Sequence, residues 1–108
     1  MPAELTSTAG CVELSYSISY SIQNTSIISP CQYTIENIIE ANGVPVPGSN
    51  IIVSNTVDTS TNVTENLSAS VLFCTNVNTN YTLQAIIVST CTQISPTRGN
   101  FNVIQLTC

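Results

Sequence analysis

The 108-residue sequence predicts an all-β fold, a jelly-roll-like sandwich of about eight antiparallel strands in one domain. Residues 12–22 alternate strictly between apolar and polar side chains, which is the period of a half-buried β-strand. Later runs rich in Val, Ile, Thr and Tyr are separated by turns rich in Asn, Ser, Gly and Pro. No stretch shows the capped, 3.6-residue apolar stripe of a helix. Short strands interrupted in this way are typical of two packed sheets.

The first two strands are predicted at residues 12–22 and 32–41. One face of the first strand carries six apolar side chains, and the other carries Glu13 and four serines. The second region alternates less strictly because Ile38 and Ile39 are adjacent, so a short helix is the alternative there. The abundance of Tyr, Thr and Ile favours a strand.

Four further strands are predicted at residues 50–57, 63–74, 81–91 and 101–108. Glu65 interrupts an otherwise apolar face, which predicts an edge or a bulge near the start of its strand. The strongly apolar segment 81–91 is predicted to be central and covered on both sides. The predicted core consists of eight side chains: Leu14, Ile18, Ile22, Leu67, Val71, Phe73, Leu83 and Ile87.

Charge and composition argue against several functions. Only 6% of the residues are charged, the net charge is −5, and Arg98 is the sole strongly basic side chain. Such a chain does not neutralise phosphates, so neither nucleic acid nor an anionic membrane is expected as a partner. Histidine, the usual general base and commonest metal ligand, is absent. We expect no enzymatic activity, no metal and no cofactor, and we interpret Glu36 and Glu40 as surface charges rather than a glycosidase pair.

The cysteines indicate an oxidising environment, because five is a high number for so short a chain. No secretory signal peptide is visible, and no CxxC pair suggests a zinc or redox site. The number is odd, so pairing within one chain leaves one thiol over. Cys11 is the first candidate for an intersubunit bond, because it lies at the root of an N-terminal arm. The alternative is a bond within the chain from Cys11 to Cys31 or Cys108.

The whole chain, a short arm with one cysteine followed by an all-β domain rich in Asn, Thr, Ser and Ile, resembles the pilus-like subunits of bacterial endospore appendages. The resemblance implies jelly-roll subunits joined edge to edge, with a flexible N-terminal connector that is locked into a neighbouring subunit by disulfides. The connector would be residues 1–11 and the sandwich residues 12–108. Cys11 would be the locking thiol, with three acceptor candidates: Cys31, Cys91 and Cys108.

The single cysteine of the arm favours the appendage type in which rings of subunits stack, rather than the staggered helical type with two adjacent cysteines. The implied partners are copies of the same chain and an anchoring protein on the spore or cell surface. Assembly in a mother cell that later lyses would need no signal peptide. The expected function is therefore a structural subunit of an extracellular or spore-surface fibre. The alternative is a secreted, disulfide-stapled binding module for carbohydrate or protein, which requires an exposed aromatic platform.

Overall fold

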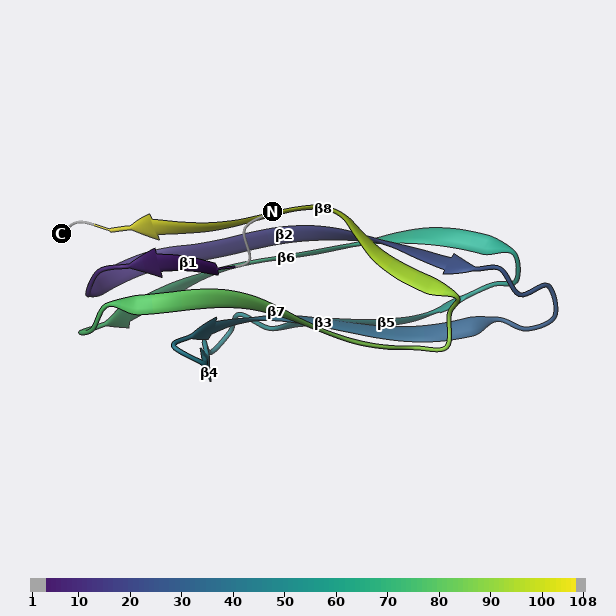
Figure 1. Ribbon diagram of the computed structural model, residues 1–108, viewed down its shortest axis with the longest axis horizontal. Helices are drawn as coiled ribbons and strands as arrows, with labels where there is room; N and C mark the ends of the chain where they lie inside the picture. The colour runs from purple at the N-terminus through teal and green to yellow at the C-terminus, as the bar shows by residue number, and fades with distance from the viewer. Residues whose placement is uncertain (1–3, 107–108) are drawn as a thin grey trace.

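The computed structural model describes residues 4–106, which form two packed antiparallel sheets and no helix (Figure 1). The predicted all-β sandwich is therefore confirmed. Its strands are β1 (Glu4–Ser7), β2 (Gly10–Asn24), β3 (Cys31–Ala41), β4 (Val44–Pro45), β5 (Ile51–Val57), β6 (Thr61–Thr75), β7 (Thr79–Ser89) and β8 (Gln93–Gln105). Within the described residues, nothing could serve as a helical membrane span.

The two sheets differ in size. The five-stranded sheet has the order β1-β7-β3, with β4 and β5 both pairing with the far side of β3. The three-stranded sheet has the order β6-β2-β8. The strands run along the long axis of a body that measures 57 × 20 × 17 Å (Figure 1). The elongated shape follows from strands of up to 15 residues, about three times the usual length.

The alternating strand β2 supplies the inner face of the three-stranded sheet. All six apolar side chains predicted for its inner face are buried, from Val12 to Ile22. β2 pairs with β6 on one side and with β8 on the other. The unpaired length of residues 12–22 would also suit them, on sequence grounds, to be an edge for strand addition by another subunit. This prediction is wrong, because both edges of β2 are already hydrogen-bonded within the chain.

The predicted core is confirmed at most positions but not at Ile87. Four of the eight side chains are buried and three more pack against them: Leu14, Ile18, Ile22 and Leu67 in the first group, and Val71, Phe73 and Leu83 in the second. Ile87 lies opposite the buried Ile35 and points toward the second sheet, yet it is 40% exposed. The reason is that, among residues 4–106, β1 pairs with β7 only as far as Thr82, so the rest of β7 is a sheet edge. The prediction that residues 81–91 are covered on both sides is wrong for this half of the strand.

A buried polar network crosses the sandwich between β2 and β3. The Tyr20 hydroxyl donates to Asn37 Oδ1 at 2.8 Å, and the Tyr16 hydroxyl donates to the Ser49 carbonyl at 2.9 Å. Ser49 is itself buried and donates to the Val46 carbonyl at 2.8 Å. Asn37 is fully buried, and its Nδ2 has no hydrogen-bond partner among the described residues. The network aligns the two sheets, since each hydroxyl is satisfied only when they are in register.

A second polar contact joins the sheets through β3 and β6. The hydroxyl of the buried Tyr33 donates to Glu65 Oε2. Glu65 lies opposite the inward-facing Tyr20, so its carboxylate points between the sheets. The predicted edge position of Glu65 is confirmed, because β6 is the outer strand of its sheet. A charge-assisted hydrogen bond of this kind compensates for placing a carboxylate on the inner face.

Alkaline pH is expected to destabilise the fold. Burial raises the pKa of Tyr16 from 10.0 to about 12 and also raises the pKa of Tyr20. The stability that comes from keeping these phenols neutral is fully present below pH 10.0 and is lost as the pH rises through about 12. Urea midpoints measured from about pH 8 upward, together with tyrosinate absorbance, check this expectation. A sample returned to neutral pH serves as the control for chemical damage, and a midpoint that does not fall above pH 10.0 would contradict it.

Candidate functional site: the disulfide-bonded ends and the open strand edges

The first disulfide joins Cys11 at the start of β2 to Cys74 at the end of β6. The two residues are directly opposite each other in the antiparallel register, with Cα atoms 4.0 Å apart. On the other side of β2, the Leu106 N–H donates to the Cys11 carbonyl at 2.9 Å. The bond therefore lies at the end of the three-stranded sheet where the N-terminal arm joins it.

The second disulfide joins Cys31 at the start of β3 to Cys91, just beyond the end of β7. The hydrogen bond from Thr90 N–H to the Gln32 carbonyl, 2.9 Å long, continues the β3–β7 pairing up to this bond. Cys31 is 3% exposed. The two disulfides thus lie in different sheets and at opposite ends of the long axis (Figure 1).

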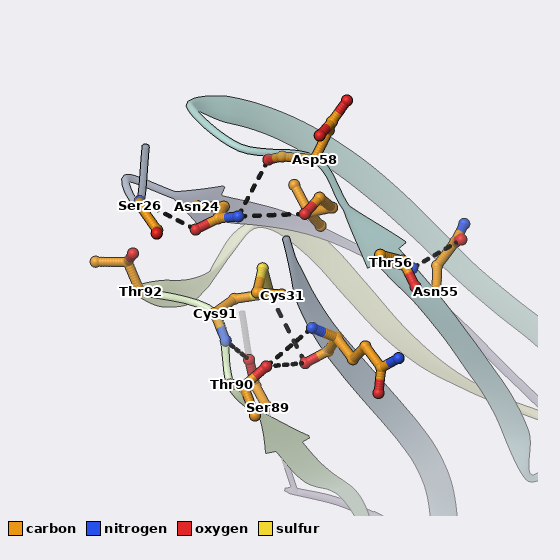
Figure 2. The surroundings of a disulfide bond; sticks show 12 residues. Asn24, Ser26, Cys31, Asn55, Thr56, Asp58, Ser89, Thr90, Cys91 and Thr92 are labelled. Carbon is orange, nitrogen blue, oxygen red and sulfur yellow. Dashed lines mark hydrogen bonds between the residues drawn. A yellow bond between two sulfur atoms is a disulfide. The ribbon is translucent and has the colours of Figure 1, made fainter. Parts of the chain in front are cut away.

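Asn24 organises the loops beside the second disulfide (Figure 2). Its buried Nδ2 donates to three backbone carbonyls at 3.1–3.2 Å, those of Ser29, Val57 and Asp58. Its Oδ1 accepts from the Ser26 N–H at 3.1 Å. One amide therefore holds the β2–β3 loop against the turn from β5 to β6, where the chain crosses between the sheets. No sequence pattern distinguishes this asparagine from the many others in the chain.

The cysteine pairing differs from the pairing that the sequence suggests. Cys11, Cys31 and Cys91 are candidates for bonds between subunits on sequence grounds, and the structure bonds each of them within the chain. Neither alternative for Cys11, a bond to Cys31 or to Cys108, is formed, because its partner is Cys74. Cys108, the remaining candidate, lies outside the described residues. A signal for Cys74 is present in the sequence, since it ends a long predicted strand whose antiparallel pairing with residues 12–22 brings it opposite Cys11.

The N-terminal arm is partly a strand. Where the sequence suggests a connector over residues 1–11, Glu4–Ser7 form β1 and pair antiparallel with β7 of the same chain. Leu5 packs against the core, and the Ser7 hydroxyl donates to the Tyr81 hydroxyl at 3.0 Å. The arm crosses from the five-stranded to the three-stranded sheet as it enters β2 (Figure 1).

Several strand edges are unpaired among residues 4–106. β6 and β8 each pair only with β2, and β7 has no partner beyond Thr82 on the side of β1. The shorter strands β1, β4 and β5 also pair on one side only. The edge of β6 is the longest, at 15 residues. The three-stranded sheet is one strand short of the four in each sheet of an eight-stranded jelly roll.

The orientation of the backbone on β6 follows from the bonds of Cys11. A strand residue directs its N–H and C=O to the same side, and the Cys11 carbonyl accepts from Leu106, just past the end of β8. Cys11 and Cys74 are therefore a non-hydrogen-bonded pair, and the backbone groups of Cys74 point away from β2. Every second residue of β6 has this orientation, so the N–H of the exposed Ser70 points to the open edge.

The described surface lacks the features that carbohydrate binding or metal binding would require. A groove of about 600 Å³ at one end of the sandwich is lined by uncharged polar side chains, including Asn42, Asn78 and Gln105. None of the six aromatic side chains of the sequence is exposed: Tyr16, Tyr20, Tyr33, Phe73, Tyr81 and Phe101. An aromatic platform for carbohydrate, as the binding-module alternative requires, is thus not formed by them. Within residues 4–106, no group of three or more His, Cys, Asp or Glu side chains could hold a metal ion.

The fold and its two internal bonds define a disulfide-stabilised β-sandwich domain. Such bonds are characteristic of proteins that mature in an oxidising, extracellular environment. Comparisons with models of protein families, with curated proteins and with solved structures found no match.

Proposed function

We propose that this chain is a structural subunit that self-assembles, by strand addition and intersubunit disulfides, into a robust fibre outside the cell or on a spore surface. The observation that carries the proposal is the unpaired, 15-residue edge of β6. A row of free N–H and C=O groups of this length is a template for pairing with another strand. Because each copy presents open edges, repeated pairing yields a ring or an open filament.

The composition of β6 supports the proposal, because most of the usual protections of an edge strand are missing. Natural edge strands carry Lys, Pro, a bulge or an inward-pointing charge, or are kept short. β6 contains no Lys, Arg or Pro, and its pairing with β2 is regular over its whole length. Of these protections β6 has one, the inward-pointing charge of Glu65, and this carboxylate is already bound by the Tyr33 hydroxyl of the same chain. By contrast, the first half of β8 contains Pro96 and a bulge.

The number of cysteines limits which of them can form a disulfide between subunits. The two internal bonds use four of the five cysteines in the sequence. An intersubunit disulfide formed in addition to them must therefore use Cys108. A bond through Cys11, Cys31 or Cys91 would require its internal bond to open first. Mass spectrometry of peptides from the assembled, unreduced protein distinguishes these two routes.

Ser70→Pro is expected to prevent assembly while the subunit stays folded. Proline removes the N–H that points to the open edge, and the ladder bonds to β2 and the core side chains are untouched. The purified chain should form high-mass species seen by electron microscopy and sedimentation, and the variant should remain monomeric.

Ser70→Ala, which keeps the N–H, is the matched control and should assemble normally. Circular dichroism and thermal unfolding of the variant verify that it folds. A soluble monomer as the only form of the unmodified chain, with unchanged mass in non-reducing gels, would reject the proposed function.

A further inference from the structure

The outer face of the five-stranded sheet carries a carboxylate between two isoleucines. In the register of β3, Glu36 lies directly opposite Ile52 on β5 and directly opposite Ile86 on β7. Opposed residues of antiparallel strands point to the same face, so the three side chains form one row across the sheet. Ile52 is 56% exposed and Ile86 is 54% exposed.

The neighbouring rows extend this apolar surface. Val88, one row along β7 on the same face, is 68% exposed, and Ile38 is the next outward residue on β3. We call Glu36, Ile38, Ile52, Ile86 and Val88 the acidic–apolar patch. Glu36 is half-buried, and none of the strand residues opposite it is basic.

The only strongly basic side chain of the sequence lies on the opposite sheet. Arg98 is exposed on β8 and pairs with Ser19 of β2. Pro96 pairs with Tyr20, so Thr97 is the extra residue of a β-bulge immediately before the arginine. Bulges redirect side chains at sheet edges. On the outer face around Arg98 the register places hydroxyls and amides, namely Ser19 and, beyond it, Asn66, but no carboxylate.

We propose that the Arg98 guanidinium of one copy binds the Glu36 carboxylate of a second copy, with the arginine stem resting on Ile52 and Ile86. The guanidinium can donate two hydrogen bonds to a carboxylate, and its apolar stem fits a surface that the isoleucines provide. The contact rests on the proposed self-assembly and identifies the residues that set the orientation of neighbouring subunits.

Charge complementarity indicates that the partner bound at the acidic–apolar patch is another copy of this chain. Glu36 and Arg98 point outward from opposite sheets, so they do not meet within one molecule. Every copy carries both halves of the pair, and the two halves lie on different surfaces. A contact between different surfaces is heterologous, and such contacts propagate into rings or open filaments. The partial burial of Glu36 reduces the screening of the pair by salt.

A charge-swap cycle tests the inference. Arg98→Glu and Glu36→Arg each place like charges together, and each is expected to raise the critical concentration for assembly about tenfold or more. The double variant carries the pair reversed, so its critical concentration should return most of the way to that of the unmodified chain. Critical concentrations are measured by sedimentation of the full chain, and thermal unfolding verifies that each variant is folded.

Glu40→Arg is the matched control, because Glu40 lies on the same strand and face but opposite Pro45 and Thr82 instead of isoleucines. Glu40→Arg makes the same change in net charge as Glu36→Arg and should leave the critical concentration within about twofold of that of the unmodified chain. Normal assembly by Arg98→Glu, or no recovery in the double variant, would overturn the pairing while leaving the proposed function intact. Absence of assembly by the unmodified chain would reject both.

Discussion

Replacing Cys31 and Cys91 together by alanine is expected to lower the free energy of unfolding by about 4 kcal/mol, the loop-entropy value for a disulfide that closes a loop of this size. The cysteines are 60 residues apart in the sequence, so their bond removes much of the freedom of the unfolded chain. The bond also fixes the loop end of the sandwich, where Asn24 holds the crossing segments. Urea unfolding of the oxidised proteins, monitored by circular dichroism, measures the difference.

The second disulfide provides an internal comparison. Cys11 and Cys74 are separated by 63 residues, so the corresponding double alanine variant should lose a similar amount. Peptide mapping without reductant should recover the linked pairs Cys11–Cys74 and Cys31–Cys91. Recovery of a different pairing would contradict the two disulfides of the structure. A decrease in the free energy of unfolding below about 1 kcal/mol in both variants would show that these bonds do not stabilise the ends of the sandwich.

Asn37→Leu is expected to destabilise the fold by about 2–3 kcal/mol, the usual effect of leaving a buried polar group without a partner. The substitution removes the acceptor of the Tyr20 hydroxyl, which is then enclosed between the sheets without its hydrogen bond. The variant also removes the unpartnered Nδ2, which offsets part of the loss. Thermal and urea unfolding provide the measurement.

A double-mutant cycle isolates the hydrogen bond from the change in shape. Tyr20→Phe removes the hydroxyl that Asn37→Leu leaves unpaired, so the double variant should be more stable than Asn37→Leu alone by about 1 kcal/mol or more. Tyr81→Phe is a suitable control, since its hydroxyl is bonded to Ser7 and not to this network. Strict additivity of the two changes would show that Tyr20 and Asn37 are not coupled.

Local alternation is enough to predict the strands and their faces. Residues 12–22 alternate without exception, and the structure places every apolar member of that run in the core. The lack of strict alternation around Ile38 and Ile39 also has an explanation. Ile39 is the core residue, and Ile38 belongs to the acidic–apolar patch on the outer face. The exposed isoleucines are therefore positioned by the same periodicity as the buried ones.

The neighbours of each strand cannot be predicted in the same way. Periodicity reports which face a side chain occupies, but it carries no information about which strand lies beside it. For this reason the sequence suggests that residues 12–22 could be an edge and that Ile87 would be covered. The order of strands places β2 in the centre of its sheet and leaves half of β7 at an edge.

Composition and alternation are enough to predict an all-β sandwich, in a chain with one strongly basic residue, six carboxylates, five cysteines and no histidine. The cysteine pairing, the open edges and the position of Glu36 between two isoleucines become known only from the folded chain. These properties depend on the register between strands that are far apart in the sequence. Cys11 meets Cys74, and Glu36 meets Ile86, because long antiparallel strands pair from end to end.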